Sequence, residues 1–370
     1  MEENEDHIAL KVQALSDLEL AVLVCLVADQ HCIIETERDL IDDVEAELQL
    51  IARDVFGLAC TVLTCTESTT LDDFGSGILA NDDTYDYFSS KIATPRNDFS
   101  STSGTPRSGR QTTSKSPRPF SPLDTRKIAN VVIAKNLNAA NSQVQIQALE
   151  LIRGKRNFSR TAVYAAPKPF LLVALNSSGT SRLTLHLNDQ FFISHTHRAE
   201  DGLPNVEDLG PGDGIMADDA SSSSVVHTLL HASAKREMKG ITLSTEDLVE
   251  LASRTEEVKI SSEVRAYLHN IIVFMRLHRA VAGGISALAT RHFNTLAHAL
   301  APLHGVDYVS PSLVALAARK IYLHRIVITA PENERSMQWG SSLEAVKAVL
   351  DGVTVEDVIE EVLQSVEPPL

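Results

Sequence analysis

The sequence predicts an α/β protein in which a parallel sheet flanked by helices is followed by a separate helical domain. Short apolar runs rich in Val, Ile and Leu alternate with helical patterns over the first half of the chain. Beyond about residue 243 only helical periodicity remains. Two stretches of small and polar residues separate these parts. We therefore expect an α/β core formed by residues 1–83 and 126–197 and a helical domain at 235–370. Linkers are expected at 84–125 and 198–234.

The predicted core strands are continuous apolar runs, which are typical of parallel strands covered on both faces. They are HCIIET at 31–36, ACTVLTC at 59–65, IANVVIAKN at 128–136, PFLLVALN at 169–176 and the looser LNDQFFIS at 187–194. Three helices are expected beside these strands, one before the first strand and two between later ones. They run from a cap at Ser16 to about residue 30, from Asp39 to Val55 before Gly57, and from Ser142 to Arg153.

Helix-start signals recur through the C-terminal part, where a capping Ser or Thr precedes each apolar stripe. We expect only helices in this part. The starts are Ser244 with Asp247, Ser261 or Ser262, Ser310 with Pro311, and Thr354 with Asp357.

Composition limits the class of protein. The chain has 370 residues, 44% of them hydrophobic, and a formal net charge of −16, which argues against binding to duplex nucleic acid. Its first residues are acidic and no run of 18 apolar residues occurs, so we expect no membrane span and a cytosolic or nuclear location. The four cysteines lack metal-site spacing and are expected to be reduced core residues: Cys25, Cys32, Cys60 and Cys65.

The first linker is rich in Ser, Thr, Pro, Gly and Arg, and such a composition predicts disorder. It also holds Ser-Pro and Thr-Pro pairs that a proline-directed kinase could modify, at Thr94, Thr105, Ser116 and Ser121. A phosphorylation-regulated adaptor is therefore one open function.

Three segments of the C-terminal part resemble the lid of the magnesium chelatase and MoxR branch of AAA+ ATPases. They are KISSEVRAYLHNIIVFMR at 259–276, GGIS at 283–286 and ALAPLHGVDYVSPSLVALAARKIYLHRI at 299–326. Three core segments resemble the same branch in the expected order, at 128–152, 170–176 and 187–194. With its Ser/Pro-rich insert, the chain is similar to degenerate fungal chelatase-like members. The resemblance implies an AAA+-like core and lid, and protein partners that include a homo- or hetero-oligomer.

The groups that hydrolyse ATP in that branch are missing. No G-x-x-x-x-G-K-[ST] loop occurs, and the turn after HCIIET reads Thr36, Glu37, Arg38 and Asp39, whose carboxylates would repel phosphate. The triplet Gly75, Ser76 and Gly77 lies in a helix-like stretch without a lysine beside it. We do not expect it to cradle phosphate.

The resemblance also places the family's functional positions on unsuitable residues. Its carboxylate pair falls on Lys135 and Asn136, which can neither hold magnesium nor accept a proton. Its intersubunit arginine falls on Gln190, and its lid arginine falls on Leu288, one turn before Arg291. Both arginine positions therefore lack the positive charge, and partial substitution by Arg291 for the lid arginine is left open.

One family group is retained, because Asn176 stands at the polar sensor position. Capping a turn is an equally good interpretation of Asn176. Lys135 could neutralise the site without a metal, although an exposed strand-end lysine is the more common case. The predicted degenerate nucleotide pocket therefore consists of Asn176, Lys135, Asn136 and Arg291, without catalytic residues.

The resulting hypothesis is a non-catalytic or weakly nucleotide-binding interaction scaffold. No tightly bound cofactor is expected, and ATP with Mg²⁺ remains open only as a weak ligand. An active chelatase-type or MoxR-type ATPase is the alternative. His195 and His197 lie on one side of a strand-like segment, but two ligands alone are a weak metal site. We therefore expect no metal site.

Overall fold

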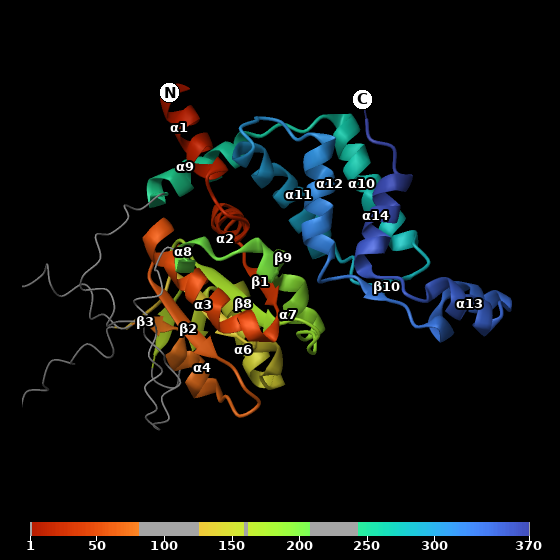
Figure 1. The fold of residues 1–370 in the computed structure, drawn as a ribbon, viewed down its shortest axis with the longest axis horizontal. Helices are drawn as coiled ribbons and strands as arrows, with labels where there is room; N and C mark the ends of the chain where they lie inside the picture. Colours follow the sequence, from red (N-terminus) through yellow and green to blue (C-terminus); the bar gives the residue numbers. More distant parts are fainter. Residues whose placement is uncertain (1, 81–125, 159–161, 208–242, 370) are drawn as a thin grey trace, which may run out of the picture.

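The computed structural model describes residues 2–80, 126–158, 162–207 and 243–369 (Figure 1). The predicted basic linker and residues 208–234 of the predicted acidic linker lie outside the described residues. In Figure 1 the sheet and its helices form one body, and the C-terminal helices form a second body against it.

The centre of the first body is a parallel five-stranded sheet in the order β2-β5-β8-β1-β9. All strands predicted from apolar runs are present, at Cys32–Thr36 (β1), Cys60–Thr64 (β2), Val131–Lys135 (β5), Leu171–Ser177 (β8) and Ile193–His197 (β9). Residues 187–194 are only partly a strand, because the helix α7 (Leu185–Gln190) takes up their first half. Residues 128–136 are divided between β5 and the short strand β4 (Lys127–Ile128).

The two faces of the sheet are covered differently. On one face, Ile34, Ile133 and Val173 pack against α2 (Asp17–Val27), α3 (Ile41–Leu50) and the C-terminal helices. On the other face, Ile33, Val132 and Leu172 pack against α4, α6 and α7. The bounds of α4 and α6 are Leu71–Gly77 and Ser142–Gly154. Because both faces are covered, alternate residues of each strand belong to different cores.

Local signals explain where the core helices begin and end. Ser16 and Glu19 form the capping box of α2. The predicted acidic helix is present as three parts, η1 (Arg38–Leu40), α3 and a π-helical turn, η2 (Ile51–Val55). Gly57 follows with φ = +63°, a conformation that ends a helix readily at glycine.

The remaining core elements are short, apart from the N-terminal helix. They are α1 (Glu2–Gln13), β3 (Leu79–Ala80), which pairs with β4, the hairpin of β6 (Arg156–Phe158) and β7 (Val163–Ala165), η4 (Leu137–Ala139), η5 (Ala199–Asp201) and α8 (Pro204–Glu207). Asn205 of α8 donates a hydrogen bond to Glu47 of α3 at 2.7 Å. The start of the segment predicted as an acidic linker is therefore docked on the core.

Every predicted helix start of the C-terminal part is a capped N-terminus. The helices are α9 (Thr245–Glu257), α10 (Ser262–Leu277), α11 (Ala287–Leu303), α12 (Pro311–Tyr322), α13 (Leu343–Leu350) and α14 (Val355–Ser365), with η7 (Pro331–Asn333) and η8 (Arg335–Trp339) before α13. None of the helices within the described ranges has the length and apolar character needed to cross a membrane.

The expectation that this part contains only helices is wrong in one detail. The short strands β10 (Val281–Gly283) and β11 (Val327–Ile328) pair antiparallel. Glycine makes this approach possible, since Gly284 has φ = +102° and a Cβ atom there would lie 2.0 Å from the carbonyl oxygen of Arg325. Two glycines in GGIS were the available signal.

We expect Ile359→Asp to destabilise the C-terminal domain by about 3 kcal/mol, because it would bury an unpaired carboxylate. Ile359 is 2% exposed on the apolar face of α14, which packs against α10 and α12. Urea denaturation would measure the loss. Gln364→Asp, on the exposed face of the same helix, is the matched control and should change stability by at most about 0.5 kcal/mol. Equal effects of the two substitutions would contradict the docking of α14.

Candidate functional site

Lys135 ends β5 and is held by two carboxylates of α3. Its Nζ atom lies 2.8 Å from Oε2 of Glu45 and also contacts Asp42, and its side chain is only 13% exposed. Burial opposes the charge, but the hydrogen bonds to Asp42 and Glu45 outweigh it and raise the pKa of Lys135. The interpretation of Lys135 as an exposed strand-end residue is therefore wrong. The ammonium group forms ion pairs that join the end of β5 to α3.

The turn between β1 and α3 offers little to a phosphate group. It passes through Glu37 and η1 without a glycine, and α3 begins with Asp42 and Asp43 in its first turn. Phosphate binds readily at a helix N-terminus because free N–H groups and the helix dipole attract it. Here carboxylates already occupy that end of the helix.

The two asparagines hold the ends of neighbouring strands. Asn136 has φ = +55°, and its Oδ1 atom accepts a hydrogen bond from Ser177 Oγ at 3.5 Å. Asn176 is 5% exposed, and its Oδ1 atom accepts a bond from the Asn138 N–H at 3.4 Å. The turn-capping interpretation of Asn176 agrees with this bond.

Strand register separates Asn176 from Lys135. Lys135 pairs with Leu175, so Asn176, one residue later, faces the opposite side of the sheet. On that side its cross-strand neighbour is Glu35, and Thr196 of β9 follows at the same level. The residues of the predicted pocket therefore do not converge on one point.

A cavity of about 290 Å³ lies at this level, between the sheet edge and the C-terminal helices. We call it the core–lid cavity. It is lined on the core side by Glu35, Asn176, Arg182, Ser194 and Thr196, and on the other side by Leu323, His324, Val355 and Glu356. Apart from Asn176, sequence reasoning did not identify these residues.

Arg291 lies elsewhere, together with the two positions where the family has arginines. Gln190, Leu288 and Arg291 line a cavity of about 470 Å³ with Arg153, His186 and Asp189. The structure therefore brings Arg291 close to Gln190 and Leu288 but into a different cavity from Asn176. Arg153 also lines it, so two guanidinium groups are present.

Arg325 joins the C-terminal helices to the core. Its guanidinium donates hydrogen bonds to the carbonyl groups of Asp189, Phe191, Phe192 and Ile321, and the bond to Ile321 is 2.6 Å long. Its Nε atom lies 3.4 Å from Oδ1 of Asp189. Its Nη2 atom also donates to Nδ1 of His292 at 2.7 Å. Burial lowers the pKa of Arg325 to about 10, so the group stays charged at neutral pH.

His324 and His292 flank Arg325 as neutral rings. Nε2 of His324 donates to the Phe191 carbonyl at 3.2 Å, and the His324 carbonyl accepts a bond from Asn188 Nδ2 at 2.7 Å. Burial, reinforced by Arg325, lowers the pKa of both imidazoles, that of His292 to about 3. The His-Arg pair at the end of the 299–326 segment was the sequence signal for this junction.

His195 and His197 do lie on one side of β9, with ring centroids 6.3 Å apart. Burial lowers the pKa of both, that of His195 to about 4. Lys320 Nζ lies 3.5 Å from His195 Nδ1, and Asp201 lies 3.9 Å from His197 Nδ1. Within the described residues no three His, Cys, Asp or Glu side chains are arranged to hold a metal.

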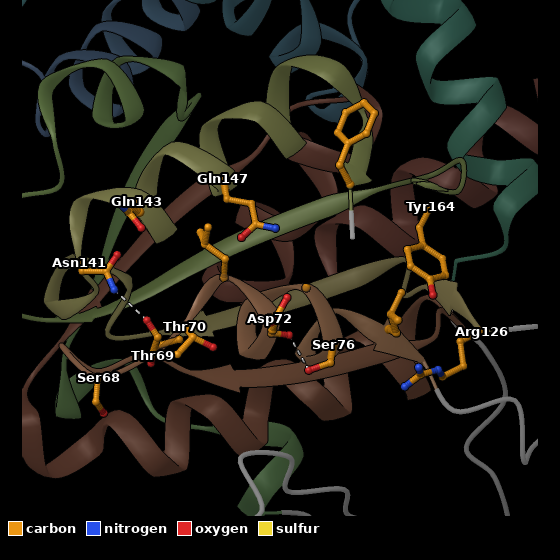
Figure 2. A pocket seen from close by; sticks show the side chains of 14 residues that line it. Ser68, Thr69, Thr70, Asp72, Ser76, Arg126, Asn141, Gln143, Gln147 and Tyr164 are labelled. Atoms are coloured by element: carbon orange, nitrogen blue, oxygen red, sulfur yellow. Dashed lines mark hydrogen bonds between the residues drawn. The ribbon is translucent and has the colours of Figure 1, made fainter. Parts of the chain in front are cut away.

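A further cavity, of about 580 Å³, lies beside α4 and α6, away from the predicted pocket residues (Figure 2). Its polar lining residues form hydrogen bonds with one another. Asn141 Nδ2 donates to the Thr69 carbonyl at 2.8 Å, and Ser76 Oγ donates to the Asp72 carbonyl at 2.9 Å. Gly75 lines it from within α4. A Cβ atom at Gly77 would lie 2.7 Å from Leu63 Cδ1, so Gly77 lets α4 pack on β2.

A family model and one solved structure agree with this architecture. The model of the AAA lid domain family matches residues 273–345. The crystal structure of an inferred ATPase from Cytophaga hutchinsonii ATCC 33406 superposes with a TM-score of 0.64 at 15% identity, covering 100% of this chain and 98% of that one. A full-length MCM homolog from Methanopyrus kandleri gives 0.43 at 11% identity, over 86% and 57% of the chains. No curated protein sequence matches.

The parallel sheet with flanking helices and the helical lid define an AAA+-like α/β fold. From here on, the domain of residues 243–369 is called the lid. The matched residues contain the predicted lid-like segments 283–286 and 299–326 and the end of the segment 259–276.

Proposed function

We propose that the protein is a degenerate relative of the magnesium chelatase and MoxR branch that acts as a non-catalytic or weakly nucleotide-binding interaction scaffold. The Lys135 cluster carries this proposal. At the strand end where an active site of this branch needs carboxylates for magnesium, a partly buried ammonium group is bonded to Asp42 and Glu45. A divalent cation would have to displace that ammonium group.

Two more features support the absence of hydrolysis. The turn after β1 has no glycine-rich amide cradle, and acidic side chains stand in the first turn of α3. Asn176 and Lys135 face opposite sides of the sheet, and Asn176 and Arg291 line different cavities, so the predicted pocket residues do not surround one common site. Phosphoryl transfer depends on positioning and charge stabilisation, and this chain's residues supply neither at the strand ends.

The alternative is an active ATPase that couples hydrolysis to metal insertion or to the remodelling of a partner. The structural similarity to an inferred ATPase favours it. At 15% identity, however, that similarity concerns the fold. The alternative would also need a second chain to supply the missing cationic groups.

We expect the purified protein to hydrolyse ATP no faster than a buffer control, and calorimetry to find at most weak ATP binding with or without Mg²⁺. Restoring the carboxylates in Lys135→Asp with Asn136→Glu should not start turnover, because the amide cradle is still missing. Phosphate release and heat of binding are the measurements.

Asn176→Ala is the discriminating variant for this proposal. Magnesium-dependent hydrolysis by the wild type that disappears in Asn176→Ala would replace the scaffold with the active ATPase. Hydrolysis at an unaltered rate in Asn176→Ala and also in Lys135→Asp with Asn136→Glu would indicate a contaminating enzyme. The protein would then be purified again and the comparison repeated.

A further inference from the structure

The core–lid cavity contains buried polar atoms without hydrogen-bond partners among the described residues. These include Ser194 Oγ, in a residue that is 3% exposed, and His324 Nδ1, in a residue that is 6% exposed. Buried polar groups in folded proteins almost always have a partner, so two on one small cavity need an explanation. A bound ligand would supply it.

The state of His324 determines what it could bind. Its Nε2 atom donates to the Phe191 carbonyl, and burial keeps the ring neutral by lowering its pKa well below the ordinary value. Nδ1 is therefore a bare acceptor. A ligand that meets His324 must bring a hydrogen-bond donor.

The charged groups of the cavity are two carboxyl groups and one guanidinium, beside neutral hydroxyl and amide groups. Glu35 is half-buried, and Glu356 of α14 is an exposed residue on the lid side. Asn176 Oδ1 already accepts from a backbone N–H, as described above. Arg182 is the one cation among the lining residues, and its Nη1 atom is bonded to the Ile326 carbonyl at 2.8 Å. Two carboxyl groups against one guanidinium favour a positively charged ligand.

The size of the cavity and the side chains around it further limit the kind of ligand that it can bind. A cavity of about 290 Å³ is at the lower limit for small-molecule sites. A nucleoside triphosphate would bring several negative charges to two carboxyl groups. Metal ions are disfavoured, because no metal-binding group of three side chains exists within the described ranges.

We propose that the core–lid cavity binds a small aliphatic amine or guanidine, whose cationic group lies between Glu35 and Glu356 and donates hydrogen bonds toward His324 Nδ1 and Ser194 Oγ. The ligand would contact strands β1, β8 and β9 together with α12 and α14. It would therefore stabilise the contact between core and lid. This inference does not depend on the absence of hydrolysis, which the phosphate-release assay measures separately.

Three probes with the same four-carbon chain test whether the cavity requires a positively charged ligand. They are putrescine, 1,4-butanediol and succinate, titrated into the full-length protein by calorimetry at constant ionic strength. We expect saturable binding of putrescine only. Binding of succinate or butanediol as strong as that of putrescine, or no saturable binding of putrescine, would overturn the proposal.

Matched variants locate the binding. Glu35→Gln should weaken putrescine binding about tenfold, because a charged hydrogen bond is lost. Ser194→Ala should weaken it by a smaller factor, which keeps the test valid if Glu35→Gln does not fold. Glu344→Gln removes the same charge from an exposed position of α13 and should leave the affinity unchanged. Equal losses in Glu35→Gln and Glu344→Gln would reveal diffuse attraction to an acidic protein and overturn the site.

Discussion

Arg325→Met is expected to lower the free energy of unfolding by about 4 kcal/mol, because the substitution leaves a set of buried acceptors without their donor. The acceptors that lose this donor are the carbonyl groups of Asp189, Phe192 and Ile321 and the Nδ1 atom of His292, whereas the Phe191 carbonyl keeps its bond from His324 Nε2. Methionine fills a similar volume, so the loss reports on hydrogen bonds more than on a cavity. Urea denaturation at neutral pH would measure it.

Arg319→Met is the matched control, since Arg319 lies in the last turn of α12, shortly before Arg325 in the chain. Its guanidinium binds Glu360 with two hydrogen bonds, but both side chains are nearly half exposed. Such surface pairs are worth at most about 1 kcal/mol. If the two substitutions cost the same, Arg325 does not hold core and lid together, and the junction rests on apolar packing alone.

Much of this fold could be predicted because its local signals agree with its packing. The fully apolar run at 170–175 is a central strand covered on both faces, and the capping residues Ser244, Ser261, Ser310 and Thr354 each start a lid helix. The β10–β11 pair was missed because strands this short carry no periodicity. The order of the strands in the sheet could not be predicted either, because it depends on contacts between segments that are distant in the chain.

The candidate site was less predictable for the same reason. That Lys135 is unsuited to hold magnesium follows from its chemistry, but its partners Asp42 and Glu45 lie about 90 residues away in the chain. Whether Asn176 faces Lys135 depends on the register between β5 and β8, which apolar runs do not specify. The core–lid cavity needs two domains to form its walls. No local pattern could have placed Glu35 near Glu356.

The second large effect that we expect is a loss of stability in mild acid, caused by imidazoles that fold in the neutral form. Burial lowers the pKa of His31 to about 4 and that of His292 to about 3, and it lowers that of His324 as well. The unfolded chain binds protons with a pKa of about 6.5. The stabilisation that comes from the neutral imidazoles is therefore fully present above this value and is lost as pH falls from about 6.5 toward 4.

The expected loss between pH 7.5 and pH 5 is about 2 kcal/mol for each imidazole whose pKa falls to about 4 or below, namely those of His31, His195 and His292, and this is a large part of a typical domain's stability. Carboxyl groups with lowered pKa values, such as those of Asp73 and Asp247, lose their contribution only in stronger acid. The raised pKa of Glu35 acts in the opposite direction. The histidines should thus dominate between pH 6.5 and pH 5.

Urea denaturation at several pH values, with His31→Gln beside the wild type, tests this assignment. Nδ1 of His31 accepts the Leu172 N–H at 3.1 Å, and a glutamine oxygen can take over that acceptor role without titrating. His31→Gln should therefore reduce the loss between pH 7.5 and pH 5 by about 2 kcal/mol, whatever its stability at neutral pH. His269→Gln, at an exposed position of α10, should leave the pH dependence as it is. An unchanged slope in His31→Gln would mean that His31 is protonated in the folded protein, against the neutral state that its burial requires.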